Sequence, residues 1–199
     1  LLAAALMGFM ILRMGVVLAW GALKELIDTG LEESQVEAIR KTLLATPGVR
    51  GLHELRTRRM AHQALVDAHV LVDARISVSE GHRIAESARA GVLREHHDVL
   101  DVLVHIDPED DLDPDLAAAG LPSREALLEE LADLLATLPT PEHVVLHYLG
   151  GRVEVEVFLA HDVFADISAL RSTEAALAER IKDHPAIRSI SLNFRIAPE

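Results

Sequence analysis

The sequence contains no cysteine, which excludes disulfide bonds and metal sites built from thiolates. Aromatic residues make up only 3% of the 199 residues, so the core must be built from Val, Leu, Ile and Ala. Positive charge is also scarce, because 19 Lys and Arg face 32 Asp and Glu, for a net charge of −13. Since nucleic-acid binding needs clustered cations, this balance argues against a nucleic-acid partner.

Familiar catalytic motifs are missing as well. The sequence has no glycine-rich phosphate loop, no serine or cysteine nucleophile motif and no His-Glu-x-x-His helix, and we therefore expect no enzyme. Eleven histidines remain to be explained. In an acidic chain without cysteine, imidazole and carboxylate groups are the ligands left for divalent cations.

The first 23 residues are apolar apart from Arg13. As a helix they would be about 34 Å long, against roughly 30 Å for the bilayer core. They lack the basic start and the cleavage site of a signal peptide. The segment therefore predicts a transmembrane helix, with a buried helix of a soluble protein as the alternative. A central Arg in a lone span costs about 2.5–3.5 kcal/mol on insertion. For this reason, and because the chain begins with Leu, we expect further membrane helices before residue 1.

After the apolar run, the periodicity of apolar residues and the positions of Gly and Pro predict the order helix, strand, strand, helix, strand twice. The first unit should have helices at 32–45 and 79–94 and strands at 49–58, 65–73 and 99–106. The second should have helices at 123–138 and 172–183 and strands at 144–149, 152–159 and 187–196. Gly150 and Gly151 are expected in a tight hairpin turn.

Strand periodicity gathers polar residues on one face of the first unit. Side chains alternate along a strand, so His69 points away from its apolar neighbours, and His105 and Asp107 do the same on the last strand. His53 lies on the strand expected to pair with that of His69, so it can reach the same face. Imidazole and carboxylate are ligands of zinc-like cations. A single strand histidine is usually a surface residue, and it is the joint pattern that predicts a metal site. Spacing leaves open whether His82, near the start of the next helix, joins it.

Segments of the two units align, which indicates a diverged internal duplication, with convergence on a common layout as the alternative. Residues 51–55 match residues 145–149, so that His147 stands in the place of His53. Residues 102–107 match residues 190–195, where Asn193 replaces His105 and Arg195 replaces Asp107. Since a cation in the place of a ligand repels metal, we expect the second unit to lack the site.

Several short segments between about residue 11 and residue 108 form a recognisable pattern: Leu12-Arg13-Met14-Gly15, Leu26-Ile27-Asp28, the run from Pro47 to Arg58, Ala68-His69-Val70, Gly81-His82-Arg83-Ile84-Ala85 and Val104-His105-Ile106-Asp107-Pro108. By these segments the first half of the chain resembles the cation diffusion facilitator family, whose members are proton-coupled exporters of zinc and similar divalent cations. Glu54 stands where the family usually has Asp, and residues 122–199 lie outside the family pattern.

The resemblance implies a homodimeric cytoplasmic domain in which Asp107 is able to bridge two ions. It implies that Asp28 joins a charge interlock at the membrane surface, with a basic residue from the missing helices or from the other subunit. The metal ligands that it implies are His53, His69, His82, His105 and Asp107.

The predicted fold class is α+β, with an N-terminal transmembrane helix followed by two small α-β-β-α-β units of the ferredoxin-like, metallochaperone-like type. The expected boundaries are a last transmembrane helix at 1–28, a cytoplasmic metal-binding dimerisation domain at 29–108, an acidic linker at 109–121 and a second unit without the metal site at 122–199.

The sequence thus predicts the C-terminal part of a zinc-type efflux transporter in a bacterial inner membrane, with residues 29–199 in the cytoplasm. Its cytoplasmic domain is expected to bind metal and to regulate a dimeric proton-coupled antiporter, with the missing transmembrane helices as partners. Zn2+ is the expected ion, although the ligand types also allow Fe2+, Mn2+, Co2+ or Cd2+. The alternatives are a purely structural dimerisation module and a soluble metal carrier.

Overall fold

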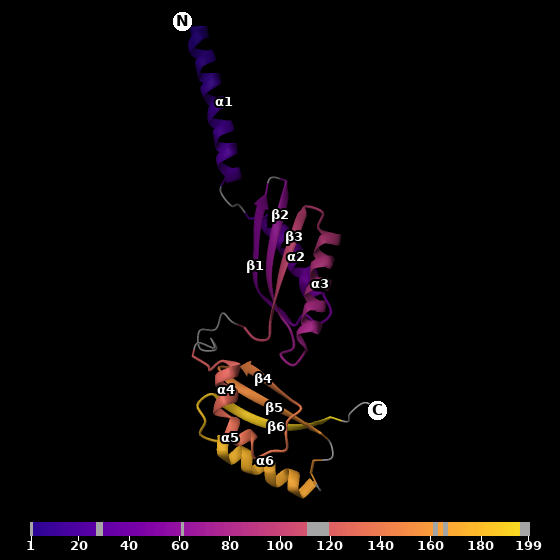
Figure 1. Cartoon of the computed structure of the whole chain (residues 1–199). Helices are drawn as coiled ribbons and strands as arrows, with labels where there is room; N and C mark the ends of the chain where they lie inside the picture. The colour runs from indigo at the N-terminus through magenta and orange to yellow at the C-terminus, as the bar shows by residue number, and fades with distance from the viewer. Residues whose placement is uncertain are drawn as a thin grey trace. The chain divides into compact units, whose positions relative to one another are not determined.

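The computed structural model describes residues 2–26, 30–60, 62–110, 120–160, 163–164 and 167–195, with the side chains of 24–26 and 195 excepted. The chain divides into two compact units between Asp110 and Asp111 (Figure 1). Each unit contains its own three-stranded sheet. The predicted α+β class with two sheets is confirmed.

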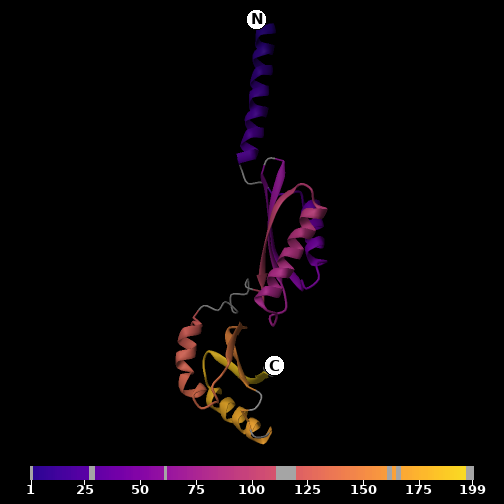
Figure 2. The same cartoon turned by 45° about the vertical axis from the view of Figure 1, so that its right-hand side comes forward.

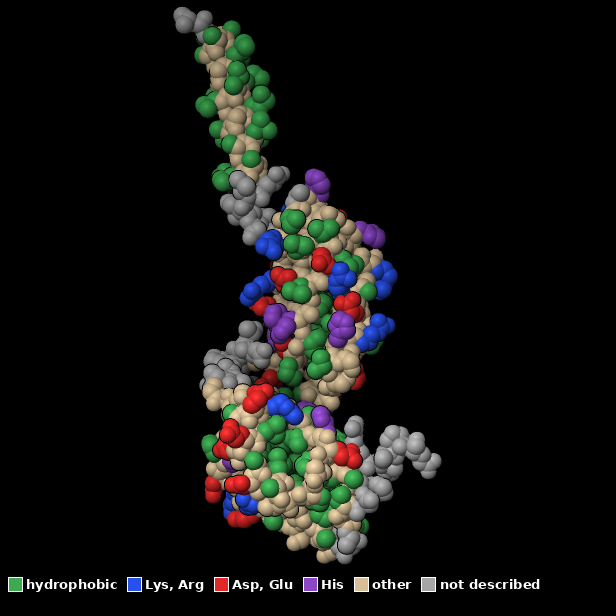
Figure 3. All heavy atoms as spheres, in the orientation of Figure 1, with side chains coloured by type: hydrophobic (Ala, Val, Ile, Leu, Met, Phe, Trp, Pro, Cys, Tyr) green, Lys and Arg blue, Asp and Glu red, His purple; other side chains and the backbone are tan. Residues whose placement is uncertain are grey.

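In the helix α1 (Leu2–Leu26), apolar side chains run along the face that Figure 3 shows. Its stretch Leu2–Leu23 has a mean hydropathy of 2.1, and none of it is buried among the described residues. By length and composition, this helix can cross a membrane. A core helix of a soluble protein would bury one face, and no such packing of α1 exists within the described part of the chain.

The first unit packs two helices on one face of a mixed sheet, as Figure 2 shows. The sheet order is β1-β2-β3, with β2 antiparallel to β1 and parallel to β3. This is the predicted order of helix, strand, strand, helix and strand. The elements are α2 (Glu33–Leu44), β1 (Gly51–Met60), β2 (Gln63–Leu71), α3 (Val78–Glu95) and β3 (Val99–Asp107).

The core of the first unit lies between the sheet and the two helices. Ser77 caps α3 by accepting a hydrogen bond from Glu80 N at 3.2 Å. Alternate positions of β2 and one stripe of each helix supply core residues, among them Ile39, Leu43, Val66, Ala68, Ala88 and Val92. Because alternate β2 residues face this core, the others, including His69, lie on the open face of the sheet.

Gly48 closes the turn between α2 and β1. Its φ is +93°, and a Cβ at this position would lie 2.6 Å from Ile84 Cδ1. We expect Gly48→Ala to lower the free energy of unfolding by about 1–3 kcal/mol, because the left-handed backbone and the close side chain both oppose a Cβ.

Gly91→Ala, within α3, is the matched control for this substitution. There the added Cβ would make an ordinary 3.6 Å contact with Thr42 Cγ2, so the alanine should raise stability by about 0.5–1 kcal/mol. Urea unfolding of the parent and the two variants checks both values. Equal destabilisation by the two substitutions would contradict this account of Gly48.

The second unit repeats the topology of the first, with β5 antiparallel to β4 and parallel to β6. Gly150 and Gly151 have φ values of +56° and +67°, and positive φ at both residues is what a tight hairpin turn requires. A separate apolar core fills this unit. Its elements are α4 (Arg124–Glu130), α5 (Ala132–Leu135), β4 (His143–Leu149), β5 (Arg152–Ala160), α6 (Ile167–Ile181) and β6 (Ile187–Arg195).

Two predicted helices of the second unit differ from the structure. The helix expected at 123–138 is interrupted at Leu131, which gives α4 and α5. The helix α6 begins at Ile167 rather than at Ser172. Thr173 explains the second error, because its hydroxyl donates back to Ala169 O at 2.9 Å, as a residue inside a helix does. Ser172, the residue before Thr173, therefore lies inside α6 and does not cap its start.

The two sheets share a register irregularity. In each, the parallel pair skips one residue of the last strand, Leu100 in β3 and Arg188 in β6. This shared feature supports the internal duplication. Aligned at that point, Phe158 takes the place of His69, and Asn193 takes the place of His105 as predicted.

Candidate metal site

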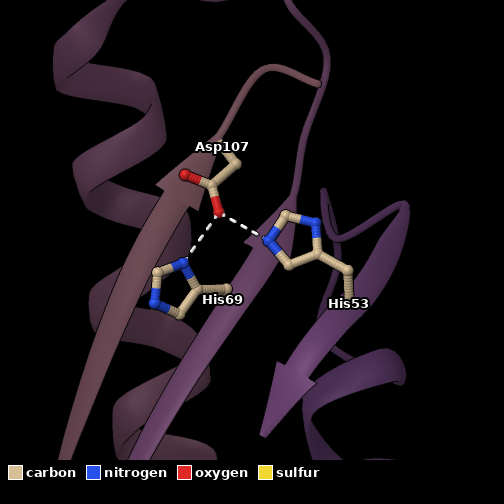
Figure 4. Close-up of side chains that lie close together, drawn as sticks. All are labelled: His53, His69 and Asp107. Atoms are coloured by element: carbon tan, nitrogen blue, oxygen red, sulfur yellow. Dashed lines mark hydrogen bonds and ion pairs between the residues drawn. The ribbon is translucent and has the colours of Figure 1, made fainter. Parts of the chain in front are cut away.

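His53, His69 and Asp107 come from the three strands of the first sheet and meet on its open face (Figure 4). One ligand atom from each lies within 4.8 Å of the others. Asp107 Oδ2 is 2.9 Å from His53 Nε2 and 3.1 Å from His69 Nδ1. Three donor atoms this close together can share one metal ion.

The parallel pairing of β2 with β3 brings the last two strands into position. His69 lies opposite His105, and Leu71 lies opposite Asp107. Asp107 is the last residue of β3, and its backbone carbonyl accepts a hydrogen bond from Val72 N at 3.1 Å. The carboxylate is thus held by the end of the sheet ladder.

A β-bulge positions His53. The pairing of β1 with β2 skips this residue, which is the extra residue of the bulge. The core residues Leu52 and Leu55 flank it three positions apart, a spacing that strict alternation would place on opposite faces. The bulge lets both leucines face the core while His53 turns toward Asp107.

Asp107 is 1% exposed, and its carboxylate is surrounded by imidazoles. A third one, His105, brings Nδ1 to 2.6 Å from Asp107 Oδ1. The side chain of His53 is 8% exposed, and its buried Nδ1 lies 3.2 Å from Asp110 Oδ1 without the alignment of a hydrogen bond. A buried carboxylate needs hydrogen bonds or a cation. Here a buried carboxylate lies among imidazoles, and the Nδ1 atom of His53 makes no hydrogen bond to any described residue. This donor set suits a divalent cation.

The two oxygens of Asp107 serve different histidines. Oδ2 faces His53 and His69, whereas Oδ1 faces His105, which is 58% exposed. The rings of His69 and His105 lie with their centroids 4.7 Å apart. The structure therefore brings three of the predicted histidines together around the carboxylate of Asp107, so that four of the five predicted ligands lie in one cluster.

The fifth predicted ligand, His82, lies apart from this cluster in the described chain. It is exposed near the start of α3 and lines a cleft of about 390 Å³ together with Val104 and Ile106. Those two β3 residues point to the side opposite His105 and Asp107. The ligand role of His82 rests on the family resemblance and stays a prediction.

Two carboxylates near the cluster were not among the predicted ligands. Glu54 pairs with His69 in the ladder, and its Oε2 lies 3.6 Å from His69 Nε2. Asp110, beside His53, was predicted to be part of the linker. Glu54 could have been found from the pairing of the two strands, whereas Asp110 follows β3 and carries no periodic signal.

Asp101 shares β3 with the cluster but binds elsewhere. Arg89 of α3 donates hydrogen bonds to its Oδ1 at 2.7 and 3.2 Å. This guanidinium holds the pKa of the Asp101 carboxyl below its usual range. Asp101 is therefore a useful comparison for Asp107, because it is an acid of the same strand with a different partner.

The remaining predictions concern Asp28 and the second unit. Asp28 lies outside the described residues. In β4, His143 is the residue that pairs with Phe158, the counterpart of His69. Since Glu54 is the partner of His69, the predicted match of His147 with His53 is wrong. The two segments are similar in residue type but differ in position, because His147 lies four residues after His143 in β4.

Residues 31–109 match the family model described as "Cation efflux protein, cytoplasmic domain". Metal tolerance protein C1 of Arabidopsis thaliana is 36% identical over 107 residues, which cover 54% of this chain and 23% of that protein. Cation-efflux pump FieF of Pectobacterium atrosepticum is 33% identical over 97 residues, which cover 49% of this chain and 31% of the pump. The chain thus spans less than a third of the length of these relatives.

Among solved structures, MamM-CTD is 25% identical to this chain with a TM-score of 0.38. That likeness covers 39% of this chain and 100% of the other.

Proposed function

We propose, on the premise that residues 31–109 are a cytoplasmic domain of the cation efflux family, that this chain is the C-terminal part of a divalent-cation efflux transporter. The convergence of His53, His69 and Asp107 in that domain carries the proposal. The apolar helix α1 supports it, because it ends only a few residues before the matched segment. The resemblance to the cation diffusion facilitator family is confirmed for this segment.

The proposed role of the cluster is regulatory metal binding. His53, His69 and one oxygen of Asp107 would hold an ion, while the other oxygen of Asp107 faces the exposed His105. These ligands suit Zn2+, and they also suit Fe2+, Mn2+, Co2+ and Cd2+. Once bound, the metal supplies positive charge that neutralises the buried carboxylate. An ion shared with a second copy of the chain would draw the two subunits together and bias the membrane part between its access states.

The proposed organisation keeps the boundaries expected from the sequence. A last transmembrane helix at 1–28 precedes the metal-binding domain at 29–108, and an acidic linker at 109–121 leads to the second unit at 122–199. The partners are a second copy of the chain and the remaining helices of a proton-coupled antiporter. Its place is a bacterial inner membrane, with residues 29–199 on the cytoplasmic side. The division into units after Asp110 supports these boundaries.

Calorimetry of the full chain in detergent tests metal binding. We expect zinc to bind at neutral pH and His53→Ala to lower the affinity by about 10–100-fold, because it removes a buried donor. Affinity should also fall at mildly acidic pH, since histidine ligands must lose their protons to bind metal. The matched control is His97→Ala, which removes an exposed histidine away from the cluster and should bind zinc like the parent.

Two results separate this proposal from its alternatives. Zinc binding that is absent, or equal in the His53 and His97 variants, would contradict the metal site. A dimer whose sedimentation equilibrium is unchanged by zinc would favour a structural dimerisation module. Partition of the intact chain into buffer rather than detergent would favour a soluble carrier.

A further inference from the structure

The chain that follows α1 is fixed to β1 within a few residues. Leu31 N donates a hydrogen bond to Thr57 Oγ1 at 3.1 Å. Leu31 lies five positions after Leu26, the end of α1. At about 3.3–3.6 Å per residue, this connection spans at most roughly 17 Å. Thr57 therefore lies close to any surface from which α1 emerges.

The β1–β2 hairpin extends beyond Thr57. Arg58, Arg59 and Met60 continue β1 and are all exposed, and His62 in the following turn is exposed as well. Met60 is 56% exposed. At about 3.4 Å per residue, three strand residues reach roughly 10 Å past Thr57. We name Arg58, Arg59, Met60 and His62 the hairpin tip.

The hairpin tip is basic in a strongly acidic chain. Its two adjacent arginines stand out against the net charge of −13. Two acidic residues at the same end of the unit, one at the end of α3 and one in the turn after it, are held by α2. Glu95 accepts from Thr42 Oγ1 at 2.9 Å, and Asp98 accepts from Gln35 Nε2 at 3.4 Å. These contacts direct the two carboxylates toward α2.

We propose that the hairpin tip binds anionic lipid headgroups on the membrane surface from which α1 emerges. Arg58 and Arg59 bind phosphate oxygens, which match the planar donors of guanidinium groups. Met60 places its apolar side chain among the headgroups. The contact fixes one end of the first unit against the bilayer, whether or not metal is bound. It rests on the proposed function only in requiring that α1 spans a membrane.

The absence of cysteine allows a direct test on the full chain. Met60→Cys carries a fluorophore at the hairpin tip, and Val78→Cys carries it at the opposite end of the unit, where the parent side chain is 93% exposed. Both proteins are placed in nanodiscs of phosphatidylcholine alone or mixed with phosphatidylglycerol, with a quencher on the headgroups. We expect quenching at residue 60 to exceed that at residue 78, and to increase with the anionic lipid.

Charge reversal provides the second arm of the test. Arg58→Glu with Arg59→Glu should lower the ratio of docked to undocked tips by about 25-fold, or about fivefold for each basic residue lost from an anionic surface. Arg75→Glu with Arg83→Glu makes the same change in charge at the other end of the unit and should leave quenching at residue 60 unchanged.

The outcomes distinguish this inference from the proposed function. Equal quenching at residues 60 and 78 in discs that hold the chain would overturn the lipid contact alone. Quenching that is insensitive to reversal of Arg58 and Arg59 would do the same. Failure of the chain to enter the discs at all would overturn both, since α1 would then not span a bilayer.

Discussion

Asp107→Asn should lower the zinc affinity of the chain by at least about a hundredfold, which is the largest effect we expect of any single substitution at the cluster. The reason is geometric, because this one carboxylate contacts His53, His69 and His105. An amide of the same size keeps the shape but loses the charge and one of the two acceptor oxygens. Competition with a chelator of known zinc affinity measures the loss.

Asp101→Asn is the matched control for this result. The substitution is identical and lies on the same strand, but the Asp101 carboxylate is bound to Arg89. Its zinc affinity should equal that of the parent. If the two asparagine variants bound zinc equally well, Asp107 would not be a ligand. Circular dichroism of both variants shows whether a loss of binding reflects a loss of fold.

The second large effect concerns the two separate cores. Leu43→Ala and Leu127→Ala should each lower the free energy of unfolding by about 2–5 kcal/mol, because each removes a fully buried leucine. Leu43 packs in the core of the first unit and Leu127 in that of the second, and both are 0% exposed. Hydrogen exchange followed by mass spectrometry should show faster exchange in β2 for the first variant and in β5 for the second.

Leu44→Ala is the control within the first unit. Leu44 is adjacent to Leu43 in α2 but is 45% exposed, so its truncation should cost much less. The result that opposes this account is faster exchange in both units for either core variant. Such a result would mean that the two units unfold as one, and the proposed boundary between them would have to be abandoned.

Most of the cluster could be predicted from the sequence, because the side chains of a half-buried strand point alternately to its buried and its open face. Once the apolar residues of β2 and β3 face the helices, His69, His105 and Asp107 must face the other way. The orientation of His53 did not follow from periodicity, since a bulge interrupts the alternation. The contact of Glu54 with His69 follows from the pairing of β1 with β2, but only in the register that this bulge sets.

The elements themselves were predicted where glycine, proline or a serine cap marks their ends. Pro47 and Gly48 follow the end of α2, and Ser123 caps the start of α4, as expected. The interruption at Leu131 carries no such signal. His82 is a different case, because it was placed at the site by resemblance alone. Its position near the start of α3 shows that a single chain does not bring it to the cluster.

The bulge at His53 adds a single residue to β1. In the second unit, β4 pairs with β5 without any such irregularity. Deleting the codon for His53 would therefore leave a regular ladder, like that of the second unit, in which Leu52 and Leu55 stand two positions apart and both face the core without a change of register. Gain or loss of one of the three imidazoles of this cluster can thus follow from insertion or deletion of a single codon. Among relatives, the number of residues in β1 therefore indicates the presence of this histidine more directly than a comparison of residue types.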